Sequence, residues 1–126
     1  MSDLVRVAVD AMGGDYAPVE PVKGAVEAVN ADERVKVQLV GQVDVIKKEL
    51  QKYTYPKERV EIVPATEIIE TGEPPVNAIR HKKDSSIVVG MKKVRYGEAD
   101  AFVSSGSTGA VLVGGQTIVG RIKGVE

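Results

Sequence analysis

Two short segments of the sequence carry residue types that suit the binding of an anion. The first is a Gly/Ser loop, Ser104-Ser105-Gly106-Ser107-Thr108-Gly109, set between a strand-like run and a helix-like one. A strand that ends in small residues and opens a helix leaves several backbone N–H groups unpaired. Such donors suit a phosphate or another anion, so the loop is predicted to hold a phosphorylated or anionic ligand. The alternative is a plain connection in which Ser107 and Thr108 only cap the helix.

The second segment, Asp10-Ala11-Met12-Gly13-Gly14-Asp15, follows the first predicted strand. Its carboxylates would lie at a carboxyl edge, where open α/β sheets bind ligands. Asp10 and Asp15 are candidates to orient a polar group, to act as a base or to bind a metal. Gly13 and Gly14 permit close backbone approach to a bound group. The alternative is that Asp10 caps a turn that the glycines merely form.

Cations near these segments extend the anion-binding hypothesis. The run Arg80-His81-Lys82-Lys83 combines the planar fork of Arg with the compact charge of Lys, and Arg121 and Lys123 follow the helix after the Gly/Ser loop. The alternative for the run is a solvated helix end whose cations complement the helix dipole. His81 is the only histidine and the chain has no cysteine, so no metal site is predicted.

Composition is that of an ordinary globular domain. The 126 residues are 43% hydrophobic and 28% charged, and only 4% are aromatic, so the core must consist of Val, Ile, Leu and Ala. The formal net charge of -1 argues against a nucleic-acid partner. No cysteine, signal peptide or membrane-spanning run is found, which predicts a cytoplasmic location.

Strand-like and helix-like patterns alternate along the chain, which predicts a three-layer α/β/α domain with a mostly parallel sheet. The chain ends without a strand to follow the last helix, so we expect it to be the first part of a larger protein. Strands are predicted over 4–9, 35–40, 60–63 and 101–103, and helices over 22–29, 45–50, 75–79 and 87–94 and from 110 onward.

Nucleotide-binding motifs are missing. The fingerprint G-x-G-x-x-G and the Walker A lysine are both absent, which disfavours an NTPase. Asp32, the one acid that might contact a ribose, lies in a polar turn, and an NAD-dependent oxidoreductase is a distant alternative. The pair Gly114-Gly115 costs helix stability, which predicts close packing against another helix, for example that of a second subunit.

Taken together, the segments resemble the bacterial acyl-acyl-carrier-protein:phosphate acyltransferase family known as PlsX. Four blocks occur in the family's order, and the resemblance covers the N-terminal part of the family's length. Ser107, Pro64 and His81 stand where members usually carry Asn, His and Arg. The blocks are 7–18, 67–86, 99–109 and 120–124.

The resemblance implies an enzyme that transfers a fatty acyl group from acyl carrier protein to inorganic phosphate, giving acyl phosphate for phospholipid synthesis. It also implies a fold like that of isocitrate/isopropylmalate dehydrogenases or phosphotransacetylases, a homodimer, peripheral association with the inner face of the cell membrane and no cofactor. Two alternatives remain: a phosphotransacetylase-like enzyme with a smaller acyl donor, and a truncated fragment without catalytic activity.

The candidate site residues fall into two groups. Asp10, Asp15 and Thr108 are the candidate catalytic residues. The candidate residues for binding phosphate or substrate are Gly13, Gly14, Arg80, Lys82, Lys83, Ser105, Gly106, Ser107, Gly109, Arg121 and Lys123.

Overall fold

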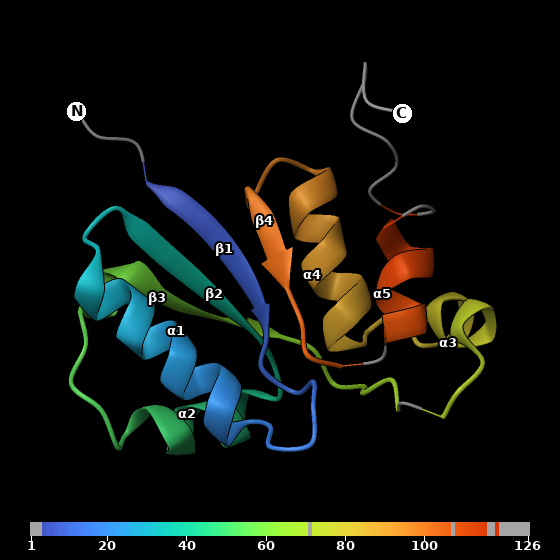
Figure 1. The fold of residues 1–126 in the computed structure, drawn as a ribbon, viewed down its shortest axis with the longest axis horizontal. Helices are drawn as coiled ribbons and strands as arrows, with labels where there is room; N and C mark the ends of the chain where they lie inside the picture. The colour runs from blue at the N-terminus through green and yellow to red at the C-terminus, as the bar shows by residue number, and fades with distance from the viewer. Residues whose placement is uncertain (1–3, 71, 107, 116–117, 119–126) are drawn as a thin grey trace.

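A four-stranded parallel sheet organises the chain (Figure 1). The computed structural model describes residues 4–70, 72–106, 108–115 and 118. Within them the strand order is β3-β2-β1-β4 and every pairing is parallel, which confirms the predicted fold class. The strands are β1 (Val5–Asp10), β2 (Val35–Gly41), β3 (Val60–Pro64) and β4 (Ala101–Val103).

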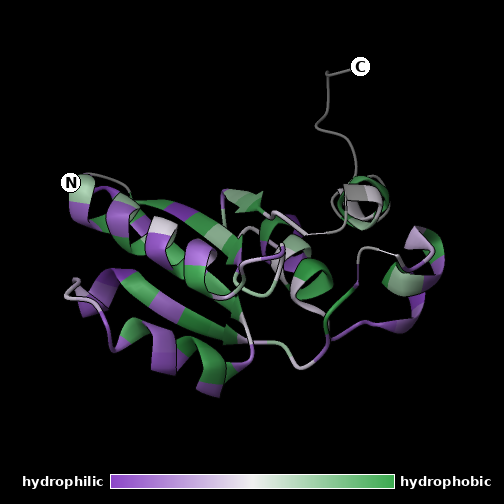
Figure 2. Cartoon of the chain, turned by 60° about the horizontal axis from the view of Figure 1, so that its bottom comes forward, coloured by the Kyte–Doolittle hydropathy of each residue, from purple (hydrophilic) through white to green (hydrophobic). Residues whose placement is uncertain are grey.

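Helices lie on both faces of this sheet. On one face, α1 (Val19–Ala31) and α2 (Val43–Leu50) pack on the sheet through a core that includes Val22, Val29 and Leu39. Figure 2 shows hydrophobic and hydrophilic residues alternating along these helices. No helix of the described residues is long and apolar enough to cross a membrane.

The opposite face is covered by α4 (Ser86–Arg95), beside which lie α3 (Pro75–His81) and α5 (Thr108–Gly114). A short 3-10 helix, η1 (Lys57–Arg59), precedes β3. Ser85 caps α4: its hydroxyl accepts from the backbone N–H of Val88 at 3.2 Å.

Close packing explains one of the two helical glycines. A Cβ atom at Gly114 would lie 2.4 Å from Met91 Sδ, so α5 approaches α4 at this point. The predicted close contact with another helix is therefore found inside this chain, and no second subunit is needed for it. Gly115 has nothing within 4 Å of its Cβ position, so the same reason does not apply there.

The order of the strands determines where a ligand would bind. From β1 the chain winds outward through β2 to β3, and then α4 brings it back across the sheet to β4 on the other side of β1. The loops that leave β1 and β4 therefore lie side by side at the carboxyl edge (Figure 1). In open α/β sheets this reversal point is where ligands usually bind.

Candidate functional site

A hydrogen-bonded relay ties the loop after β1 to the loop after β4. Ser104 Oγ donates to Asp10 Oδ2 at 2.7 Å and accepts from the backbone N–H of Gly106 at 3.0 Å. The other carboxylate oxygen of Asp10 accepts from the backbone N–H of Met12 at 3.0 Å. Asp10 is 2% exposed, and both of its oxygens are used inside the protein: Oδ1 fixes the loop after β1, and Oδ2 joins that loop to the one after β4.

Two glycines let the loops touch backbone to backbone. A Cβ atom at Gly13 would lie 2.4 Å from Asp10 Oδ2 and 2.9 Å from the backbone nitrogen of Gly106. Gly14 has φ +92°, in the left-handed region, and lies against Ser105. The sequence predicted that Gly13 and Gly14 permit close approach to a bound group; in the structure both glycines lie against the neighbouring loop, and the approach to a ligand stays a prediction.

Six residues of the two loops lie together, and residues in and beside this cluster differ in their exposure to solvent. Asp10 and Gly13 are buried, whereas Asp15 and Ser105 are exposed to solvent. The side chains of Asp15 and Ser105 are therefore available to an incoming ligand, whereas the side chain of Asp10 is not. The cluster consists of Asp10, Gly13, Gly14, Ser104, Ser105 and Gly106.

Thr108 and Gly109 begin α5 beside this cluster. A Cβ at Gly109 would lie 2.5 Å from Pro75 Cγ, so the first turn of α5 rests against the start of α3. Gly106 already donates its N–H to Ser104, which removes one donor that the sequence assigned to an anion. Three candidates, Ser107, Arg121 and Lys123, lie outside the described residues.

The basic run divides into paired and exposed members. Lys82 Nζ donates to the backbone oxygen of Ile68 and to Glu73 Oε2, both at 2.7 Å. The hydrogen bond from Lys82, with a second from the backbone of Glu70, lowers the pKa of Glu73. Lys82 is thus engaged in fixing the loop before α3, while Arg80 and Lys83 are exposed.

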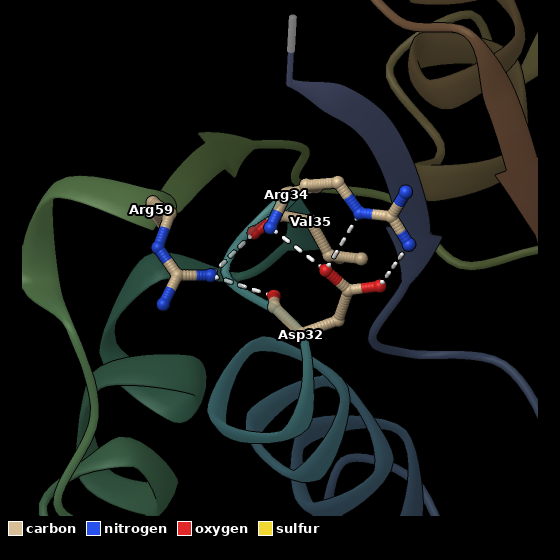
Figure 3. A network of polar contacts seen from close by, with 4 residues as sticks. All are labelled: Asp32, Arg34, Val35 and Arg59. Carbon is tan, nitrogen blue, oxygen red and sulfur yellow. Dashed lines mark hydrogen bonds and ion pairs between the residues drawn. The ribbon is translucent and has the colours of Figure 1, made fainter. Parts of the chain in front are cut away.

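Asp32 belongs to a structural network at the opposite edge of the sheet (Figure 3). Its carboxylate accepts from the backbone and side chain of Arg34, which lowers the pKa of Asp32 to about 2. Arg59 donates to the backbone oxygens of Asp32 and Val35. This network joins the end of α1 to the start of β2, far from the carboxyl edge where a ribose would bind.

Ser104 is the residue that sequence reasoning left out of the candidate site, although it named the loop. A signal for it exists in the register: Val9 pairs with Val103, so Asp10 and Ser104 are the next residues along adjacent parallel strands. Register cannot be read before the strand order is known. In the described part of the chain, no three His, Asp or Glu side chains gather as a metal site requires.

Known proteins match this chain along nearly all of its length. A family model described as "Fatty acid synthesis protein" matches residues 5–126. Phosphate acyltransferases from Clostridium beijerinckii and Alkaliphilus oremlandii are 49% and 50% identical over 122 and 123 residues. Each match covers 97% of this chain, but only 37% and 36% of the relative. The chain therefore spans little more than a third of the length of these relatives.

Proposed function

Because the chain belongs to the fatty acid synthesis protein family, we propose that it forms the N-terminal part of the α/β domain of a phosphate acyltransferase. The proposed reaction moves a fatty acyl group from acyl carrier protein to inorganic phosphate. The observation that supports this most directly is the meeting of two glycine-rich loops at the reversal point of the sheet, tied by Asp10 and Ser104.

In the proposed reaction a phosphate oxygen attacks the thioester carbonyl of the acyl donor and forms a tetrahedral oxyanion. The carbon–sulfur bond then breaks, the thiolate leaves on the carrier protein, and acyl phosphate is the product. Holding phosphate beside the thioester contributes through proximity, and N–H donors aimed at the oxyanion stabilise it. Direct transfer of this kind needs no nucleophile from the enzyme.

Each site residue then has a proposed role. Asp10 is a positioning residue, because its two oxygens are engaged with Met12 and Ser104. Asp15 is exposed in the same loop and orients phosphate. In this proposal the Gly/Ser loop at 107–109 receives the anion together with cations from the basic run and from the chain after α5. Those cations are Arg80, Lys83, Arg121 and Lys123, with Lys82 fixing the loop before α3.

The wider setting is part of the same proposal. The product supplies phospholipid synthesis, and the complete enzyme acts in the cytoplasm as a homodimer with peripheral contact to the inner face of the membrane. Two other assignments compete with it. In the first, a smaller acyl donor would make the protein phosphotransacetylase-like. In the second, the chain is a fragment that binds the anion but lacks the rest of the cleft and catalyses no reaction.

The test traps acyl phosphate with hydroxylamine after mixing enzyme, palmitoyl-acyl carrier protein and phosphate. Three proteins are compared: the 126-residue chain, the complete C. beijerinckii enzyme, and a chimaera in which this chain replaces the matched region of that enzyme. Product from the chimaera is expected. A chimaera that folds but makes no product, beside an active relative, contradicts the proposal. Preference for acetyl coenzyme A over the carrier-bound donor would support the phosphotransacetylase-like alternative.

A further inference from the structure

One face of the two strands that form the candidate site is only partly covered in the described part of the chain. Val7 pairs with Ala101 and Val9 with Val103, so these side chains lie on the same face in adjacent strands. Val9 packs against the core shared with α1 and α2, which identifies the face. Along it Val5 is 48% and Val103 is 53% exposed. We call the five residues of this face the apolar stripe: Val5, Val7, Val9, Ala101 and Val103.

A groove of about 360 Å³ separates the stripe from α1. The helix side of the groove includes Gly24 and Ala28, one turn apart. A Cβ at Gly24 would meet nothing within 4 Å, so the surface of α1 is both small and open there. Small residues on a helix allow another helix to approach closely.

The opposite face of the same strands packs against α4. Ala8 of β1 is completely buried, and a Cβ at Gly90 of α4 would lie 2.2 Å from the ring of Phe102. Parallel sheets normally have helices on both faces, because their strands are apolar on both sides. The exposed stripe is therefore one half of a packing interface whose other half is missing from the described residues.

We propose that an amphipathic helix, supplied by the polypeptide that the relatives carry outside the match, occupies this groove. The match covers only 37% of the C. beijerinckii enzyme, so the unmatched part of that enzyme is long enough to provide such a helix. The six residues of β1 extend over roughly 20 Å, which a helix of about 13 residues spans. Its apolar side faces the stripe and fits beside Gly24 and Ala28.

A fatty acyl chain is the main competing occupant, because Asp10 and Ser104 line one end of the groove. The apolar stripe, however, extends beyond the residues that line the groove, along β1 to the exposed Val5. A single acyl chain would leave much of both strands in water. A helix about 10 Å wide covers two adjacent strands, which lie about 5 Å apart.

Cysteine labelling tests the proposal, because this chain has no cysteine of its own. Ala28→Cys and Val103→Cys place single thiols on the two walls of the groove, and Lys23→Cys places a control on the exposed side of α1. Each variant is made in the 126-residue chain and in the chimaera, with any cysteine of the relative's portion replaced by Ser. Thiol labelling rates are then compared at several protein concentrations.

Both groove thiols should react at least about tenfold more slowly in the chimaera than in the 126-residue chain, since packing protects buried sites. The Lys23→Cys control should react equally in both. Equal groove rates would overturn the proposal. It would also fail if protection required palmitoyl-acyl carrier protein, or if it rose with concentration in the 126-residue chain, which would indicate a second copy. Should the chimaera not fold, the relative's unmatched portion is added as a separate chain.

Discussion

Asp10 and Ser104 are 94 residues apart in the sequence and share a 2.7 Å hydrogen bond between Ser104 Oγ and Asp10 Oδ2. The same hydroxyl accepts from Gly106, so one side chain controls the relative position of two loops. This makes Ser104 the residue on which the geometry of the candidate site depends most directly.

Replacing Ser104 should cost stability. Ser104→Ala leaves Asp10 Oδ2 and the N–H of Gly106 without their partner, which costs about 1–3 kcal/mol for partly buried polar groups. Ser105→Ala is the matched control, because that side chain is exposed and should stay within about 0.5 kcal/mol. Urea unfolding followed by circular dichroism measures both, and equal stabilities would refute the role of the relay.

Two glycines should respond to alanine with opposite signs. Gly13→Ala places a methyl group 2.4 Å from Asp10 Oδ2, and this overpacking should destabilise by about 1–3 kcal/mol. Gly24→Ala meets nothing within 4 Å in the middle of α1 and should stabilise by about 0.5–1 kcal/mol. The measurement is the thermal unfolding midpoint of each variant relative to the wild type. Midpoint shifts of the same sign in both variants would contradict the packing described.

The contact between α4 and β4 predicts a rescue. Gly90→Ala drives its methyl group into the ring of Phe102 and should cost about 1–3 kcal/mol. In a Phe102→Leu background the same change should cost much less, because the smaller side chain leaves room. A double-mutant cycle measured by urea unfolding tests this. Additive effects would show that the two residues do not clash.

Acid should weaken the junction between β3 and α4. Thr66 donates to Asp84 from its hydroxyl at 2.6 Å and its backbone N–H at 3.0 Å, which lowers the pKa of Asp84 below its ordinary value of 3.8. A lowered pKa in the folded state stabilises the protein above the unfolded value, and this contribution is lost as pH falls through the folded value.

The measurement is the urea midpoint of the wild type and of Thr66→Val between pH 7 and pH 3. Thr66→Val removes the hydroxyl donor, so it should be less stable near neutrality and should lose less stability on acidification. The two curves should converge below pH 4. Parallel curves across the range would mean that this hydrogen bond does not link stability to pH.

Phosphate dependence tests the proposed anion site in the chimaera. Replacing Thr108 and Arg121 together should raise the phosphate KM sharply, because an N-terminal turn and a cation are altered at once. Lys47→Met, an exposed change on α2, should leave it unaltered. Hydroxylamine trapping over a range of phosphate concentrations provides the values, and an unchanged KM in the double variant would refute this placement.

Most of the fold followed from local patterns. The helices that became α1 and α4 and all four strands were predicted by apolar spacing and turn residues. The relay from Asp10 to Ser104 was not, because it depends on β4 pairing with β1 across the sheet. The pairing of Lys82 with Glu73 was missed for a similar reason, since neither charge pattern nor spacing shows which lysine has a partner.

The position of β4 has a consequence for the order in which the protein acquires its parts. During synthesis β1 can pair with β2 once about a third of the chain has emerged, and α1 and α2 can then bury their core. The second neighbour of β1 arrives only at Ala101–Val103. A ribosome-bound chain that stops short of β4 could hold β1, β2 and β3 with Asp10 bound by Met12, but Asp10 Oδ2 would lack Ser104. The candidate site is thus among the last features of these residues to form.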